Sequence, residues 1–200
     1  MFLKSQPALI LASTSAYRRA LLERLGVPFS TASPGVDETR LDGESPHTLV
    51  TRLALAKSAA VAARHPDAWV IGSDQVAVRT GSTAVTLGKP GSVENCIAQL
   101  CDSSGQELEF LTAVTVLRHS DGASHQFLDS TRVAIRRLDR ATIERYVSVE
   151  SPLDCAGGFK SEGLGITLCD RIESIDPTAL IGLPLIQLAQ ILRRVGMQIP

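Results

Sequence analysis

The segment Leu9–Leu22 constrains the fold more than any other part of the chain. The apolar run at its start predicts a buried strand, and three hydroxyl residues follow that run: Ser13, Thr14 and Ser15. Ser15 is a favoured N-cap residue, and the leucines at helical spacing behind it predict a helix that ends at Gly26. A strand that passes through a short polar turn into a helix is typical of an α/β protein.

The first turn of this predicted helix carries Arg18 and Arg19. Cations at that end oppose the helix dipole, which favours negative charge there. Backbone N–H groups, hydroxyls and two guanidinium groups together bind anions well. We therefore predict an anion site and expect the anion to be a polyphosphate. The alternative is a surface helix whose arginines are only solvated.

A second helix is predicted to begin at Ser45-Pro46 and to run to about Arg64, because serine caps helices and proline suits the first helical position. The spacing of three and four residues places Lys57 on the apolar face of this helix, not opposite it. A lysine in that position either extends its ammonium to the edge of the helix or points it into a site. The residues leave both possibilities open.

Asp74 interrupts a predicted strand between Trp69–Gly72 and Val76–Val78. A buried aspartate is costly unless its charge is paired or hydrogen-bonded. Asp74 therefore needs a partner or a chemical task, or else it is a structural aspartate that caps a turn. The adjacent carboxylates of Asp37 and Glu38 lie in a polar loop and, on their own, indicate an ordinary solvated segment.

The remaining pattern alternates strands with helices. Strands are expected at 27–32, 107–118, 126–136 and 166–169, helices at 92–103 and 139–150 and from Pro184, and a hairpin at 79–87 with its turn around Thr80-Gly81-Ser82. This order with a hairpin in the middle indicates an α/β fold with a mixed sheet.

Two further segments carry cations. Lys89 stands in Gly88-Lys89-Pro90, which is no P-loop because proline follows the lysine. Lys160 and Glu162 lie in a glycine-rich segment, 155–165, where closely spaced glycines indicate close backbone approach or positive φ angles. A flexible loop with one cation and one anion suits a ligand clamp.

Composition limits the class of protein. The 200 residues are expected to form a single domain, 1–200, in which 44% apolar residues suffice for a core. A net charge of −1 and only 4% aromatic residues argue against a nucleic-acid or anionic-membrane partner. The N-terminus lacks a signal-peptide pattern and no apolar run could span a bilayer. The four cysteines form no CxxC pair, so we expect reduced cysteines in a cytoplasmic protein, without a zinc site.

Several separated motifs occur together in one order. They are Ser13-Thr14-Ser15-Ala16-Tyr17-Arg18-Arg19, Val36-Asp37-Glu38, Ser73-Asp74-Gln75, Gly88-Lys89-Pro90, Phe159-Lys160-Ser161-Glu162-Gly163 and Gly182-Leu183-Pro184-Leu185. With them the chain resembles the Maf family of nucleoside triphosphate pyrophosphatases over nearly its whole length.

The resemblance implies an elongated α/β fold similar to that of the inosine triphosphate pyrophosphatases, with a central mixed sheet flanked by helices and a cleft between two lobes. It implies hydrolysis of a nucleoside triphosphate between the α and β phosphates, a divalent cation (Mg²⁺ or Mn²⁺), a cytoplasmic location and a homodimer.

The resemblance also implies residue roles. Glu38 and Asp74 would bind the metal, and Asp74 would be the catalytic proton acceptor. The triphosphate would be held by the hydroxyl and cationic residues of the motifs and of the second helix: Ser13, Arg18, Arg19, Lys57, Lys89 and Lys160.

Within the family, Ser73-Asp74-Gln75 and Glu162 resemble the branch associated with 7-methyl-GTP, whereas the dTTP and UTP branch tends to carry Ala-Asp-Thr and a glutamine. Tyr17 could stack on a base made cationic by methylation. Glu162 could accept hydrogen bonds from the N1 and N2 protons of guanine, and Gln75 could add amide hydrogen bonds. Two residues depart from the pattern: Ala16 replaces a frequent proline, and Tyr17 replaces a frequent tryptophan.

Two other functions stay open. One is a pyrophosphatase for another canonical or modified nucleotide, such as dTTP or UTP. The other is a nucleotide-binding regulator of cell division without catalysis.

Overall fold

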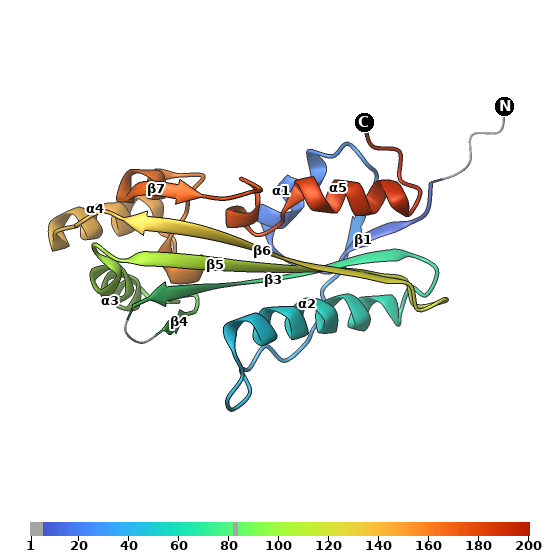
Figure 1. Cartoon of the computed structure of the whole chain (residues 1–200), viewed down its shortest axis with the longest axis horizontal. Coiled ribbons are helices and arrows are strands. Elements are labelled where there is room, and N and C mark those ends of the chain that lie inside the picture. The colour runs from blue at the N-terminus through green and yellow to red at the C-terminus, as the bar shows by residue number, and fades with distance from the viewer. Residues whose placement is uncertain (1–5, 82–83) are drawn as a thin grey trace. The chain divides into compact units, whose positions relative to one another are not determined.

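The computed structural model describes residues 6–81 and 84–200 of the chain (Figure 1). The expectations for the first five residues and for the end of the hairpin turn, at Ser82, lie outside the described residues. By its contacts the chain divides into two compact units: unit 1 comprises 1–74, 112–129 and 182–200, and unit 2 comprises 75–111 and 130–181. In the described part, no helix combines the length and the apolar character needed to cross a membrane.

Among residues 6–81 and 84–200, seven strands form a mixed sheet, as the pattern predicts. Their bounds are β1 (Leu9–Leu11), β2 (Ser30–Thr31), β3 (Trp69–Thr80), β4 (Val85–Leu87), β5 (Glu107–Leu117), β6 (Ser124–Ile135) and β7 (Cys169–Glu173). The strand order is β2-β1-β3-β5-β6-β7, and β4 pairs with β3. Strand β1 runs parallel to β2 and β3. Strand β4 runs antiparallel to β3, and β7 runs antiparallel to β6.

In the part of the chain that the structure describes, five α-helices accompany the sheet: α1 (Ala16–Glu23), α2 (Pro46–Ala62), α3 (Val93–Ser103), α4 (Arg140–Glu150) and α5 (Leu185–Arg194). Side-chain oxygens cap the first four by accepting a hydrogen bond from the third residue after the cap: Ser15, Ser45, Ser92 and Asp139. Each cap satisfies a backbone N–H that has no partner within the helix, which fixes where the helix begins. The α/β fold with a mixed sheet and flanking helices is confirmed.

Each unit has its own apolar cluster. In unit 1, β1, α2 and the start of β3 pack around Val61 and Val70, both fully buried. In unit 2, β5, α3 and α4 pack around Leu100, Phe110 and Ile143. The four cysteines are free, as expected, and Cys96 lies within the unit 2 cluster.

Two predicted strands differ from the structure. The strand expected at 27–32 is reduced to β2, because Pro28 has no N–H to donate to a neighbouring strand. The strand expected at 166–169 is wrong, since Leu164–Leu168 forms a 3-10 helix and β7 begins only at Cys169. Gly165 allows that tight turn: its backbone N–H donates to the Lys160 carbonyl at 3.1 Å.

Candidate active site

The hydroxyls of Ser13 and Ser15 accept hydrogen bonds from the backbone N–H groups at the N-terminus of α1. Ser13 follows β1 and is buried, and its Oγ accepts a hydrogen bond from the Ser15 N–H at 3.1 Å. The Ser15 Oγ in turn accepts from the Arg18 N–H at 3.4 Å, which completes the predicted N-cap. The strand, turn and helix therefore place Arg18 at a defined point in unit 1.

The Arg18 guanidinium is fixed by the backbone at Gly182. Its Nε donates to the Gly182 carbonyl at 3.0 Å, and the Ser73 Oγ donates to the same oxygen at 2.9 Å. Burial lowers the pKa of Arg18 from its usual value, while the charges of Asp74 and Glu38 raise it. Arg18 thus remains a cation, since arginine is not deprotonated in proteins, and acts electrostatically on both carboxylates.

Lys57 from α2 lies between two carboxylates of unit 1. Its Nζ is 2.6 Å from Asp74 Oδ1 and 2.8 Å from Glu38 Oε1. The side chains of Lys57 and Asp74 are 6% and 10% exposed, and that of Glu38 is 56% exposed. The ammonium is therefore buried beside Asp74 and also reaches the more exposed Glu38, and Lys57 is the partner that Asp74 requires.

Burial raises the pKa of the Asp74 carboxyl above its ordinary value, although Lys57 and Arg18 lower it. Desolvation disfavours the ionised form of a carboxylic acid, and here it outweighs the attraction of two cations. A carboxylate with a raised pKa is a stronger base than an exposed one. Such perturbed groups gather at functional sites.

A glycine brings α2 close to β3 (Figure 1). A Cβ on Gly72 would lie 2.2 Å from the Ala54 carbonyl oxygen and 2.6 Å from the Ser58 nitrogen. Only a residue without a side chain permits this approach, which sets Lys57 beside Asp74, two residues along the same strand. The sequence carries a signal of this close approach: a glycine in an apolar strand and small residues four apart in α2.

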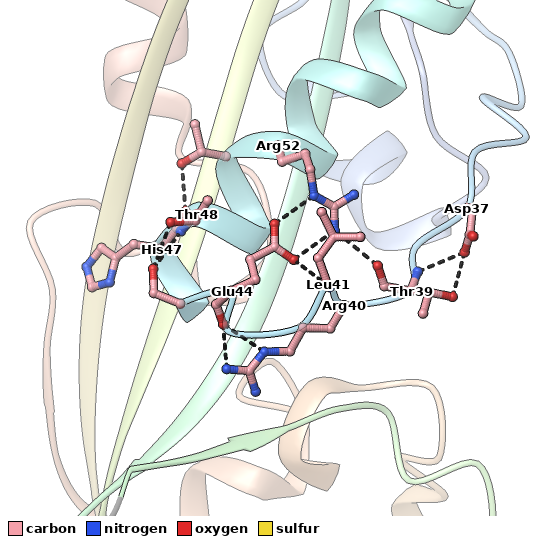
Figure 2. A network of polar contacts seen from close by, with 10 residues as sticks. Asp37, Thr39, Arg40, Leu41, Glu44, His47, Thr48 and Arg52 are labelled. Atoms are coloured by element: carbon pink, nitrogen blue, oxygen red, sulfur yellow. Dashed lines mark hydrogen bonds and ion pairs between the residues drawn. The ribbon is translucent and has the colours of Figure 1, made fainter.

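Glu44 and Arg52 form a second charged cluster in unit 1 that sequence reasoning missed (Figure 2). The buried Glu44 carboxylate accepts hydrogen bonds from Arg52 Nε at 2.7 Å and Nη2 at 2.9 Å. It also accepts from the Leu41 N–H at 3.1 Å. These contacts, led by those of Arg52, lower the pKa of Glu44 to about 2.

In unit 2, the glycine-rich loop 155–165 contacts Glu150 of α4 through an ion pair and a backbone hydrogen bond. Lys160 Nζ lies 2.6 Å from Glu150 Oε1, and Glu150 Oε2 accepts from the Leu164 N–H at 2.7 Å. These two hydrogen bonds lower the pKa of Glu150. The buried Tyr146 hydroxyl accepts from the Lys160 N–H at 3.0 Å and donates to the Gly158 carbonyl at 3.2 Å.

The loop requires its glycines. Gly157 and Gly158 have φ angles of 66° and 64°, which disfavour any side chain. A Cβ on Gly163 would lie 2.3 Å from the Glu150 carboxylate, and one on Gly165 would lie 2.3 Å from the Lys160 carbonyl oxygen. The prediction of close approach and positive φ is confirmed.

Three other candidate residues of unit 2 lie as follows. Lys89 is exposed, and the carbonyl of the preceding Gly88 accepts from the Gly157 N–H at 3.1 Å. Gln75 Nε2 donates to the carbonyls of Ala179 and Leu180, at 2.9 and 3.1 Å, so this amide binds backbone. Glu162 is exposed and accepts from the Ser161 hydroxyl at 3.4 Å.

The other two candidates are on α1. Arg19 pairs with Glu23 one turn along the helix, Nε to Oε1 at 3.1 Å, and its side chain is largely exposed. Tyr17 is half-buried. Of the two arginines in the first turn, Arg18 is therefore the one whose charge acts on Asp74.

The carboxylates of Asp74 and Glu38 can supply part of a metal site. In the described residues, no group of three or more His, Cys, Asp or Glu side chains could hold a metal alone. Mg²⁺ commonly uses one or two carboxylates and completes its shell with substrate phosphates and water. Two carboxylates that face one ammonium fit such a shared site, because a cation can take the place of the lysine charge between them.

Comparison with protein families gives one match that covers most of the chain. A family model described as "Maf-like protein" matches residues 8–195.

Curated relatives match over nearly their whole length. Proteins named "7-methyl-GTP pyrophosphatase" are 56% identical in Xanthomonas campestris pv. campestris (strain 8004), 53% in Aromatoleum aromaticum and 49% in Pseudomonas putida. These matches cover 97%, 96% and 96% of this chain, and 99%, 97% and 98% of the relatives. Among solved structures, the Staphylococcus aureus Ham1 protein superposes with a TM-score of 0.43 at 14% identity, over 64% of this chain and 71% of that one.

Proposed function

The chain belongs to the Maf family, and on this basis we propose that it hydrolyses 7-methyl-GTP to 7-methyl-GMP and pyrophosphate. Relatives that share about half of its residues over nearly the whole length carry the name of this activity. The observation in the structure that supports the proposal best is the buried Lys57 ammonium between the carboxylates of Asp74 and Glu38. That cluster combines phosphate-binding charge with a basic carboxylate.

We assign the proton-accepting role to Asp74. Its raised pKa makes the Asp74 carboxylate a stronger base toward water than an ordinary aspartate. The activated water attacks the α phosphorus, and the bond from that phosphorus to the oxygen bridging to the β phosphate breaks. Pyrophosphate leaves with that oxygen.

The cations of the site would balance the charge of the triphosphate and of the leaving pyrophosphate. We assign this role to the cationic residues of the motifs and of α2: Arg18, Arg19, Lys57, Lys89 and Lys160. The Ser13 hydroxyl would add a hydrogen bond to the phosphates. Arg18 offers the strongest structural support, because its Nε is already held by Gly182 and the guanidinium is thereby oriented. Preorganised cations stabilise developing negative charge more effectively than mobile ones.

A divalent cation, Mg²⁺ or Mn²⁺, held by Glu38 and Asp74 together with substrate oxygens, would add Lewis-acid polarisation of the phosphate. We further propose that the base is recognised by Tyr17 through stacking and by Glu162 through hydrogen bonds to guanine. Gln75, whose amide binds the backbone at Ala179 and Leu180, would act by shaping that segment. A homodimer and a cytoplasmic location complete the proposal, and light scattering after size-exclusion chromatography would test the first.

The test is a substrate panel with pyrophosphate release as the readout. We expect kcat/KM to be highest for 7-methyl-GTP among 7-methyl-GTP, GTP, dTTP and UTP, and turnover to stop when EDTA removes the metal. A preference for dTTP or UTP would assign the chain to the other branch of the family. Binding of 7-methyl-GTP without pyrophosphate release would instead favour a regulatory role.

A further inference from the structure

The loop 37–44 carries Glu38 but contains no helix or strand. The contact between Glu38 and Lys57 cannot hold this loop alone, because the Glu38 side chain is more than half exposed and exposed ion pairs contribute little. Asp37 contributes a local turn, in which its Oδ1 accepts from the Thr39 N–H at 2.9 Å. Another group must therefore fix the position of Glu38.

The buried carboxylate of Glu44 is the anchor of the loop. Its side chain is 4% exposed, and both oxygens are occupied by the guanidinium of Arg52 in a bidentate pair. The same carboxylate accepts from the Leu41 N–H, and Arg40 Nε donates to the Glu44 carbonyl at 2.9 Å. Glu44, at the end of the loop, is thus hydrogen-bonded to Arg40 and Leu41 in its middle.

Arg52 connects this anchor to the residue next to Glu38. Besides pairing with Glu44, its Nη2 donates to the Thr39 carbonyl at 3.1 Å (Figure 2). Arg52 and Lys57 stand on the same helix, α2, so the helix holds the loop at Thr39 and receives the Glu38 carboxylate at Lys57. Both contacts are made from one rigid element.

From this geometry we propose that Glu44 and Arg52 are positioning residues that hold Glu38 at the Lys57–Asp74 pair for the reaction. The proposal rests on the proposed function, because it assigns these two residues a role in that turnover. Neither residue is assigned contact with substrate. Their effect on catalysis passes through the carboxylate of Glu38.

The experiment compares Arg52→Gln and Glu44→Gln with a matched control, Arg64→Gln, each made in the wild type and in the Glu38→Gln background. Arg64 also donates from Nη2 to a backbone carbonyl, that of Ser33 at 2.7 Å, but outside this loop. Kinetics with 7-methyl-GTP give kcat and KM. Hydrogen–deuterium exchange reports the amides of 38–41 without any need for activity.

We expect Arg52→Gln to lower kcat/KM by about tenfold to about a hundredfold in the wild type, because displacement of a catalytic group by about 1 Å can cost about a hundredfold. In the Glu38→Gln background the further loss should be less than about twofold, because two residues that act through one group are not additive. Exchange at 38–41 should rise in Arg52→Gln and not in Arg64→Gln.

Glu44→Gln serves as the second variant if Arg52→Gln does not fold, since it keeps the volume and one acceptor oxygen. Equal losses in both backgrounds, or unchanged exchange at 38–41, would overturn the positioning role. If the wild type releases no pyrophosphate from 7-methyl-GTP, the proposed function fails, and amide exchange alone then decides whether Arg52 fixes the loop.

Discussion

Lys57 in unit 1 and Lys160 in unit 2 both pair with carboxylates, and the two arrangements differ. In unit 1, Lys57 is buried and serves both Asp74 and Glu38. In unit 2, Lys160 is 23% exposed and serves Glu150, which also accepts the Leu164 N–H. The first cluster contains two carboxylates around a lysine that is almost fully buried. The second contains one carboxylate, and it links Lys160 of the glycine-rich loop to Glu150 of α4.

The pKa shifts of the acidic partners have opposite signs. Burial raises the pKa of Asp74 in spite of its cations, and hydrogen bonds from Lys160 and Leu164 lower the pKa of Glu150. An ionised Asp74 is therefore held at a cost to stability, while an ionised Glu150 is stabilised by its surroundings. A buried carboxylate whose ionised form is destabilised, such as Asp74, indicates a chemical role. A carboxylate whose ionised form is stabilised by hydrogen bonds, such as Glu150, indicates a structural role.

The largest effect is expected from Asp74→Asn. The amide cannot accept a proton from water, so kcat should fall about a thousandfold or more, while nucleotide binding stays measurable. Pyrophosphate release and calorimetric titration with 7-methyl-GTP provide the two readouts, and circular dichroism checks the fold. Turnover close to that of the wild type would remove Asp74 from the catalytic role.

The next comparison sets Lys57→Met against Lys160→Met. Loss of Lys57 leaves a buried carboxylate without its nearest cation, so we expect about hundredfold lower kcat/KM and about 3 kcal/mol lower stability at neutral pH. Loss of Lys160 should lower kcat/KM by less than about tenfold. Kinetics and urea unfolding measure both effects. Equal losses in the two variants would contradict the larger role that we assign to Lys57.

A smaller effect is expected from Gly72→Ala. The added methyl group meets the backbone of α2, so the helix must shift and Lys57 must move relative to Asp74. We expect about 2 kcal/mol lower stability from overpacking and about tenfold lower kcat. Gly81→Ala is the matched control, since no atom lies within 4 Å of its added Cβ. A stable, fully active Gly72→Ala variant would show that the close approach is dispensable.

The smallest effect is the pH dependence of stability, and its sign separates the two carboxylates. Glu150 has a lowered folded-state pKa, so the advantage of the wild type over Glu150→Gln is present above pH 4.5 and is lost as pH falls through that lowered value. Asp74 has a raised folded-state pKa, so the wild type loses stability relative to Asp74→Asn as pH rises from 3.8 through it. Urea unfolding between about pH 3 and about pH 7 measures both slopes. Slopes of the same sign would refute the contrast.

The sequence predicted the elements whose signals are local. The caps at Ser15 and Ser45 act over three residues, and the apolar face of α2 follows from helical spacing, so Lys57 could be placed on that face. The prediction failed at 166–169, where a run of apolar residues suggested a strand. There the backbone at Gly165 bonds back to Lys160 and forms a 3-10 helix, a preference that depends on the folded loop.

Parts of the site could not be predicted from local residue patterns, because the partners are far apart in the sequence. Glu38 lies in a segment that alone suggests a solvated loop, and only the fold brings it to Lys57. The pair of Glu44 and Arg52 has no motif, since eight residues separate a loop from a helix face. The resemblance predicts that Gln75 recognises the base, and only the fold shows that its Nε2 donates to the Ala179 carbonyl.

Local residue patterns were sufficient to predict most of the strands and helices, the helix caps, an aspartate that needs a cation and a lysine on an apolar helix face. The tertiary structure decided that these two residues are partners, because the missing side chain of Gly72 lets α2 approach β3. The tertiary structure also raises the pKa of Asp74, because desolvation depends on everything packed around the carboxyl and not on its neighbours in the chain.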